Sequence, residues 1–333
     1  MPLAADTSPT PQTPPQRSAL ADLQRRLALG SALLGALLLG AAWRWAPGWA
    51  WALLALGLWG HALVLALEFA LAARVNRGDS VAPPSSGQRL AAWWQETQLT
   101  PTVFLWRQPF RWRDWPDSVA KPSEAPADAA VVFFHGFVCN RGFWAPWMRA
   151  LRGSGLPFTS MNLEPVFGSI DAGIPLIEDA VARAEALCTS PVTLVCHSMG
   201  GLAARAWLAS APGNLQRVAR VVTIGSPHHG TWLARWSRVA NGRQMRLHSD
   251  WLRALAAKES TLHGDQAYAK FVCWYSNADH IVYPVSTATL PGADNRHVPG
   301  LAHVALGFHP RVMRESLAML TPASISLSAR TAS

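Results

Sequence analysis

One stretch of this 333-residue chain decides its fold: residues 191–204, which read PVTLVCHSMGGLAA. The apolar residues 192–196 predict a short buried strand, and the small residues after Met199 predict the start of a closely packed helix. Ser198 lies between the two, at the apex of a sharp turn. A serine held on a strained strand-to-helix turn presents its hydroxyl as a nucleophile. The alternative is an ordinary serine at a helix N-terminus, which the flanking strand and the paired glycines make the weaker interpretation.

The turn departs from the usual Gly-x-Ser-x-Gly pattern at one position. Gly200 supplies the second glycine, which lets the helix pass close to the neighbouring strand, but Cys196 replaces the first. Cysteine is small and is commonly buried, so the sharp turn can still form. We therefore predict a nucleophile elbow in which Cys196 either narrows the turn or only fills the space.

The composition indicates a globular domain joined to a membrane portion. Half of the residues are hydrophobic and only 15% are charged, which is low for a protein that is soluble throughout. The formal net charge is +9, but the arginines are scattered and form no basic run interleaved with aromatic residues. We therefore expect attraction to lipid headgroups and no binding to nucleic acid. The four cysteines fit no zinc-binding spacing, and no metal or cofactor is expected.

Two apolar runs near the N-terminus predict a two-helix membrane hairpin over residues 27–77. The runs cover residues 27–43 and 49–73, and a Pro-Gly turn lies between them. The second run exceeds the roughly 20 residues that a helix needs to cross a bilayer. A secretory signal peptide is the alternative for the first run. The immediate second run and the lack of a clean cleavage site favour the hairpin.

The distribution of arginine predicts the orientation of the hairpin. Arg44 lies in the turn, whereas the other arginines of this region flank the hairpin: Arg17, Arg25 and Arg26 before it, and Arg74, Arg77 and Arg89 after it. Positive charge is retained on the cytoplasmic side of a membrane, so both ends of the hairpin should face the cytoplasm. The rest of the chain divides into a disordered, basic N-terminus (1–26), a flexible linker (78–88), the main domain (89–320) and a disordered tail (321–333).

Short apolar runs alternate with helical patterns in the main domain. The runs predict strands at Val131–Phe134, 157–162, 192–196, Val218–Ile224 and Phe271–Tyr275, and helices at 143–153, 172–188, 200–211, 232–238, 248–258 and 310–320. This alternation predicts the α/β class, with a mostly parallel central sheet covered on both faces. Residues 102–112 alternate and are rich in aromatic side chains, which predicts one or two further strands that open the domain.

A second stretch, VVFFHGF at residues 131–137, predicts a buried strand that ends in His-Gly. Gly136 allows the backbone to approach a substrate carbonyl, and the amides of Phe137 and Met199 are then placed to bind a developing oxyanion. His135 is interpreted as a residue that orients this loop. The alternative, a catalytic base, puts a histidine on the wrong side of the serine in chain order.

Two later stretches supply an acid and a base. Asp279 follows the β-rich run Phe271–Tyr275, where a carboxylate can orient an imidazole and stabilise its charged form. Its competitors are Asp250, Asp265 and Asp294, of which Asp294 is the serious alternative. His303 follows a Gly-Leu-Ala loop and is the candidate general base. His297 and His309 are interpreted as surface or helix-start residues.

From residue 130 to 320 the chain resembles α/β-hydrolases of the lipase and esterase group, especially bacterial triacylglycerol lipases. The resemblance is carried by CHSMGG at 196–201, VTIGSPHHGT at 222–231 and NLEPVFGSID at 162–171. It implies a carboxylic ester hydrolase that works through an acyl-enzyme, without a cofactor, on a lipid or other ester. It also implies site roles: Ser198 as nucleophile, Asp279 as acid, His303 as base, and Phe137 and Met199 as the oxyanion hole.

The hairpin is not part of the usual secreted lipase. With it, we expect a protein of the bacterial inner membrane whose catalytic domain lies in the cytoplasm. A hydrolase-fold acyltransferase or a non-catalytic binding protein is the alternative function. Residues 230–266 carry apolar side chains at helical spacing, which fits a mobile lid and a packed helix pair equally well. The motifs do not specify acyl-chain length, headgroup or oligomeric state.

Overall fold

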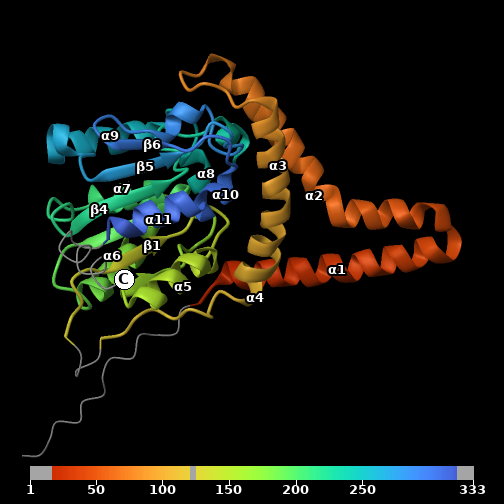
Figure 1. The fold of residues 1–333 in the computed structure, drawn as a ribbon, viewed down its shortest axis with the longest axis horizontal. Helices are drawn as coiled ribbons and strands as arrows, with labels where there is room; N and C mark the ends of the chain where they lie inside the picture. Colours follow the sequence, from red (N-terminus) through yellow and green to blue (C-terminus); the bar gives the residue numbers. More distant parts are fainter. Residues whose placement is uncertain (1–16, 121–124, 321–333) are drawn as a thin grey trace, which may run out of the picture.

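A six-stranded sheet in the order β2-β1-β3-β4-β5-β6 forms the centre of the computed structural model, which describes residues 17–120 and 125–320 (Figure 1). Every strand pairing is parallel. The strands are β1 (Val131–Phe134), β2 (Phe158–Ser160), β3 (Val192–His197), β4 (Val218–Ile224), β5 (Phe271–Tyr275) and β6 (Asp294–His297). The predicted parallel sheet is therefore confirmed. β6 is not among the predicted strands, because its sequence is polar and it forms a partly exposed edge.

Helices cover both faces of the sheet, as the alternation predicts. One face packs against α6 (Ile174–Glu185), α7 (Met199–Leu208) and α9 (Asp250–His263); the other packs against α5 (Ala145–Ser154), α10 (His303–Phe308) and α11 (Pro310–Ala318). Successive residues of β1 alternate between the two cores: Val132 and Phe134 belong to the first, and Val131 and Phe133 to the second. The sheet is thus buried on both faces, and its carboxyl edge is left as the place for a site.

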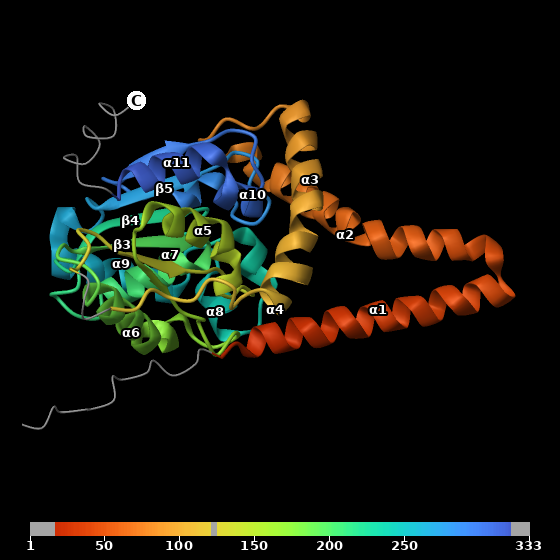
Figure 2. The ribbon, with the colours of Figure 1, turned by 60° about the horizontal axis from the view of Figure 1, so that its bottom comes forward.

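Two long helices project together from the sheet (Figures 1 and 2). They are α1 (Ala19–Trp45) and α2 (Pro47–Val75), and Ala46 alone joins them. Both are long and apolar enough to cross a membrane. Apolar side chains along them are exposed, such as Leu33 at 64% and Leu56 at 59%. α1 begins earlier than expected, because Ser18 caps it and Leu20 and Ala21 are buried, so residues 19–26 are helical and not disordered.

The prediction of strands at residues 102–112 is wrong. α3 (Ser86–Pro101) continues into a π-helical turn (Thr102–Arg107) and then α4 (Gln108–Phe110). Val103 is fully buried in the core that also contains α5 and α10. The aromatic, β-branched composition suggested a strand, but contact with this core decides the conformation. α3 stands between the sheet and the projecting helices in both views (Figures 1 and 2).

Residues 78–88, expected as a flexible linker, are attached to the loops that follow β5. Asp79 Oδ2 accepts a hydrogen bond of 2.9 Å from the Ser286 amide. Ala82 O accepts one of 3.0 Å from Asn277 Nδ2. Ser85 then begins α3 with a capping box. The expected disordered segments 1–16 and 321–333 lie outside the described residues.

Candidate active site

Ser198 occupies the turn between β3 and α7 with φ 54° and ψ −126°, a strained conformation for a residue other than glycine. Its amide donates to Ile224 O at 2.9 Å, which ties the turn to β4. A Cβ at Gly200 would lie only 2.4 Å from Phe134 O, so this position requires glycine. The close passage of α7 over β1 and the strained serine together have the geometry of a nucleophile elbow.

Cys196 continues β3 and does not alter the elbow. It pairs with Phe134 on one side and Thr223 on the other, and its side chain is fully buried in the core beneath α7. Burial raises the pKa of the Cys196 thiol well above its usual value, so the thiol stays neutral. Since Cys196 has ordinary strand geometry, the position does not require glycine, and the cysteine fills space in the core.

His303 and Asp279 form a buried pair at the carboxyl edge of the sheet. His303 Nδ1 lies 2.8 Å from Asp279 Oδ2. Asp279 Oδ1 accepts two further bonds of 2.9 Å from the amides of Ile281 and Val282, which fix the carboxylate. The carboxylate therefore has the partners it needs to hold an imidazole in one orientation.

The charges of this pair support each other. Burial alone would lower the pKa of His303, but the charge and hydrogen bond of Asp279, with smaller effects of Glu96 and Glu68, raise it above its usual value. Burial alone would raise the pKa of Asp279, but the charge and hydrogen bond of His303 and the Val282 amide hold it below its usual value. The arrangement thus stabilises an imidazolium beside a carboxylate.

Ser198 lies beside this pair. Gly225 follows the residue that binds the Ser198 amide, and a Cβ on Gly225 would lie 3.2 Å from both Asp279 Oδ2 and the His303 ring. The ring of His197, next to Ser198, is 4.7 Å from the His303 ring. Within the described part of the chain, no hydrogen bond joins Ser198 Oγ to His303. The three residues therefore lie at the carboxyl edge of the sheet, Ser198 after β3, Asp279 after β5 and His303 at the start of α10.

The loop after β1 lies directly against Ser198. A Cβ on Gly136 would be 2.9 Å from Ser198 Cβ, so only glycine allows this approach. His135 orients the loop: its Nε2 accepts from the Leu163 amide at 2.8 Å, and its Nδ1 then donates to Gly136 O at 2.9 Å. Burial lowers the pKa of His135 to about 4. With both nitrogens bonded and the ring neutral, His135 has the geometry of a loop-orienting residue.

Phe137 and Met199, the predicted oxyanion-hole residues, each adjoin a residue of the elbow: Phe137 follows Gly136, which lies against Ser198, and Met199 follows Ser198 itself. Met199 is the first residue of α7, where an amide has no acceptor within the helix. Phe137 follows Gly136, and its ring packs edge-on against Phe167 at 5.9 Å. The loop after β1 and the start of α7 therefore each bring one of these residues close to the elbow.

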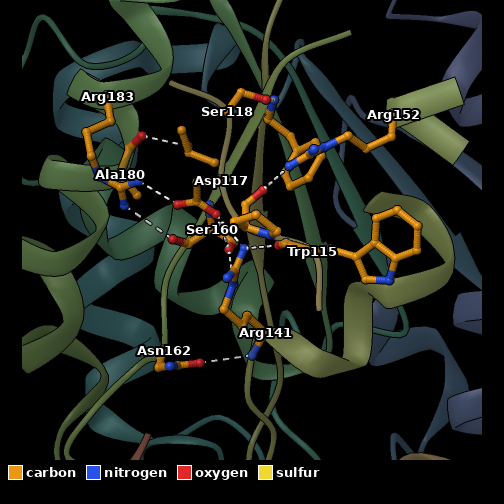
Figure 3. A network of polar contacts seen from close by, with 12 residues as sticks. Trp115, Asp117, Ser118, Arg141, Arg152, Ser160, Asn162, Ala180 and Arg183 are labelled. Carbon is orange, nitrogen blue, oxygen red and sulfur yellow. Dashed lines mark hydrogen bonds and ion pairs between the residues drawn. The ribbon is translucent and has the colours of Figure 1, made fainter. Parts of the chain in front are cut away.

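Polar contacts anchor the far end of this loop at Arg141 (Figure 3). Arg141 Nε donates to Ser160 Oγ at 2.6 Å, and Nη2 donates to Asp117 Oδ1 at 2.5 Å. The Arg141 amide donates to Asn162 Oδ1 at 3.0 Å. Asp117 also pairs with Arg183 of α6 at 2.5 Å. This buried network joins the loop to β2 and α6, so the loop is fixed at its end.

The N-terminal helices hold the same loop from the other side. Asn140 Nδ2 donates to Gln108 O at 2.9 Å. Gln108 Oε1 accepts a bond of 3.2 Å from Gln24 Nε2 of α1. α1 is therefore linked through α4 to the loop that carries Phe137.

Glu96 is a residue of the site region that the sequence prediction missed. It belongs to α3 and is 1% exposed, and its carboxylate accepts bonds from the amides of Val304 and Ala305 at 2.8 and 3.0 Å. These amides begin α10, the helix that starts at His303. The available sequence indication was its place on the buried stripe of α3, four residues after Ala92.

The competing acids lie away from His303. Asp294 is exposed on β6 and pairs with Arg296 at 2.7 Å. Asp250 begins α9 and Asp265 lies in the short helix after it, and both are exposed. His297 stacks on Tyr275 at 5.1 Å, and His309 precedes α11. Of these candidates, only Asp279 reaches the histidine.

Residues 230–266 are packed against the elbow helix. Arg205 of α7 makes a two-pronged ion pair with Glu259 of α9, at 2.8 and 2.6 Å, and both side chains are almost fully buried. Trp251 Nε1 donates to Asp171 Oδ2 at 2.8 Å. These contacts favour the packed-helix interpretation over the mobile lid.

Comparisons with known proteins bear on the fold of the chain. The model of the PGAP1-like alpha/beta domain family matches residues 169–267, which include the elbow. Mature lipase BlEst2 of Bacillus licheniformis is 18% identical, with a TM-score of 0.52 over 62% of this chain and 96% of that one. Lipase B of Aspergillus fumigatus is 20% identical, with a TM-score of 0.49 over 60% of this chain. The matched region spans 53% of that lipase. No curated protein sequence matches the chain.

The parallel sheet, the strained serine turn and the likeness to BlEst2 define an α/β-hydrolase fold. The prediction of this fold is therefore confirmed. Another solved structure that resembles the chain is Est1E of Butyrivibrio proteoclasticus, which is 15% identical with a TM-score of 0.45 over 61% of this chain and 92% of that one.

Proposed function

We propose that this chain is a membrane-anchored serine hydrolase that cleaves carboxylic esters through an acyl-enzyme. The observation that carries the proposal is the 2.8 Å Asp279–His303 pair beside the strained Ser198 turn. A histidine oriented by a carboxylate, next to a serine on a strained strand-to-helix turn, is the arrangement that activates a serine nucleophile. Ser198 follows β3, Asp279 follows β5, and His303 begins α10. The three residues therefore occur in the chain in the order serine, acid, histidine, which is the order of this fold.

In the proposed reaction, Ser198 Oγ attacks the ester carbonyl while His303 Nε2 takes its proton. Asp279 holds the opposite ring nitrogen and stabilises the imidazolium. The amides of Phe137 and Met199 donate to the oxyanion of the tetrahedral intermediate. His303 then protonates the leaving alcohol, which leaves the acyl group on Ser198. A water molecule, activated by the same histidine, releases the acid.

An apolar groove supports a lipid ester as the substrate. The groove has a volume of about 650 Å³, lies between α1 and α2, and is lined mainly by leucine and alanine side chains of the two helices. One end is lined by Val138, the residue after Phe137. An acyl chain lying in this groove would therefore point toward the elbow from the apolar surface of the hairpin.

The exposed surface of α1 and α2 supports anchoring in a bilayer. Their leucine and tryptophan side chains would be hydrated if the helices stood in water, at a cost that grows with apolar area. In the proposed arrangement the hairpin crosses the bacterial inner membrane. The catalytic domain lies in the cytoplasm, where the flanking arginines also lie.

The test is the substitution Ser198→Ala in the full-length chain. Hydrolysis of a chromogenic short-chain ester should fall to background, and a fluorophosphonate probe should no longer label the protein. Ser190→Ala is the matched control, because Ser190 is an exposed serine on the loop before β3. Ester hydrolysis by Ser198→Ala at a near-normal rate would defeat the proposal.

The same assays separate the other functions that the fold allows. A binding protein would leave Ser198 unlabelled by the probe in the unsubstituted chain. An acyltransferase would be labelled, but would transfer the acyl group to an added alcohol faster than to water. A series of esters of increasing chain length, with and without lipid vesicles, then tests the lipid substrate: rates should rise with chain length and with vesicles.

A further inference from the structure

The helix that carries the candidate base begins without a cap of its own. His303, Val304 and Ala305 are the first residues of α10, and their amides have no acceptor within the helix. Ala302 precedes them and has no side-chain oxygen that could accept a hydrogen bond. The acceptor comes from 208 residues earlier in the chain, where the two oxygens of Glu96 bind the Val304 and Ala305 amides.

This contact fixes α10 in two ways. A carboxylate that binds two adjacent amides defines both the position and the rotation of the first helical turn. Above its pKa, Glu96 also places a buried negative charge at the positive end of a helix, next to His303. Burial raises the pKa of Glu96 to about 7, although the two amides and His303 lower it.

We propose that Glu96 is a positioning residue for His303: from α3, it holds the start of α10 so that the imidazole faces Ser198, and its charge stabilises the protonated ring. The inference rests on the proposed function. Glu96 itself touches neither Ser198 nor a substrate, so its effect passes through the backbone and the field at His303.

The charged groups that act on His303 are acidic side chains. Asp279 bonds it directly, and Glu96 and Glu68 raise its pKa from α3 and α2. His197 and His280 are also close, but burial lowers the pKa of His280 to about 3 and that of His197 well below its usual value. Both rings are therefore neutral at pH 7 and add no positive charge.

His280 extends this arrangement to α2. Its Nε2 lies 3.5 Å from Glu68 Oε2 and 3.9 Å from Glu96 Oε1. Its ring stacks on Phe69 with centroids 4.7 Å apart. Glu96 therefore lies where α2, α3 and α10 meet, and the projecting helices contribute to the surroundings of the base.

The experiment compares Glu96→Gln, Glu96→Asp and the unsubstituted full-length chain in detergent, by kcat, KM and the pH profile of kcat/KM on a chromogenic ester. Glu96→Gln should lower kcat about 10-fold to 100-fold, as small misplacements of a catalytic group do, with KM little changed. Because a negative charge is lost, the pKa of His303 falls, and the acid limb of kcat/KM should move to lower pH. Glu96→Asp keeps the charge but is too short for both amides, so kcat should fall with a smaller shift of the limb.

Glu259→Gln is the control, because Glu259 is equally buried but pairs with Arg205 on the far side of α7. It should lower thermal stability and leave the acid limb in place. If Glu96→Gln leaves the acid limb of the kcat/KM profile at the same pH, the inference is overturned, whether or not kcat falls. A merely structural role predicts that result. An equal shift in Glu96→Asp overturns it as well. If the unsubstituted chain hydrolyses no ester and Ser198 is not labelled, the proposed function itself is wrong. That result is distinguishable from the two outcomes for the Glu96 variants, which require an active unsubstituted chain.

Discussion

At the scale of single residues, the site depends on charges that are buried in pairs. His303 has its pKa raised mainly by Asp279, and Asp279 has its pKa lowered mainly by His303. A histidine acts as a general base only when it is neutral, so a raised pKa moves the active pH range upward. In a serine hydrolase built in this way, the pH at which the rate rises should therefore be higher than the pKa of a free histidine.

We predict that kcat/KM rises with a midpoint above about 6.5, the usual pKa of histidine. Asp279→Asn removes the carboxylate charge, so the pKa of His303 falls and the midpoint should move to lower pH. The same substitution should reduce kcat about 10⁴-fold, because the imidazole loses the partner that fixes its tautomer. The pH profile of ester hydrolysis measures both effects. Asp294→Asn, on the exposed edge strand, is the control, and an equal change there would contradict the assignment of the acid.

At the scale of elements, the elbow depends on how closely α7 crosses β1. Gly200 is the point of contact, since a Cβ there would meet Phe134 O at 2.4 Å and His135 O at 2.8 Å. Both atoms belong to the backbone and cannot rotate away. Separation of α7 from β1 would also move Met199 and Ser198. A change in the packing of this crossing should therefore also change the reactivity of Ser198.

Gly200→Ala should therefore destabilise the protein by about 1–3 kcal/mol, as overpacking of a core does, and slow the labelling of Ser198 by a fluorophosphonate. Gly153→Ala is the matched control, because Gly153 lies in α5 with no atom within 4 Å of an added Cβ. It should leave labelling unchanged and stabilise the helix by up to about 1 kcal/mol. Denaturant unfolding and labelling rates give the comparison. Equal stability of the two variants would show that the crossing is less tight than the structure has it.

Sequence patterns were sufficient where the determining residues are close together in the chain. The strained serine turn, the five apolar strands and the place of Asp279 after β5 each follow from a run of about ten residues. β6 was missed because a polar edge strand has no apolar period. The assignment of strands to residues 102–112 was wrong, because contact with the core of α5 and α10, and not local composition, makes residues 102–110 helical. Glu96 could not be assigned a partner from sequence, since 208 residues separate it from Val304.

At the scale of the whole molecule, the projecting helices are continuous with the site. α2 contacts the loop after β5 through Phe69 and His280, and α3 contacts α10 through Glu96. α1 reaches the loop of Phe137 through Gln24 and Gln108. The hairpin therefore contacts both the loop of Phe137 and the loop of Asp279 in the candidate site.

The arrangement predicts that the chain resists extraction from membranes by alkaline carbonate and that both ends face the cytoplasm. A phosphatase reporter that is active only in the periplasm should be inactive when fused after Ser333. The same reporter inserted after Gly48, at the start of α2 and close to the joint at Ala46, should be active. The opposite pattern would invert the proposed orientation and place the catalytic domain outside the cytoplasm.

In the proposed membrane arrangement, bilayer thickness affects the proposed chemistry, because the two helices of the hairpin contact different parts of the candidate site. α1 is linked to the loop of Phe137, whereas α2 lies against the loop of Asp279. A helix whose apolar length differs from the hydrocarbon thickness tilts to match it. Unequal tilting of α1 and α2 would alter the spacing between oxyanion donor and base, where a shift of about 1 Å can change a rate 100-fold. The acyl-chain length of the surrounding lipids would then act on turnover as a physical parameter, independently of which lipid is the substrate.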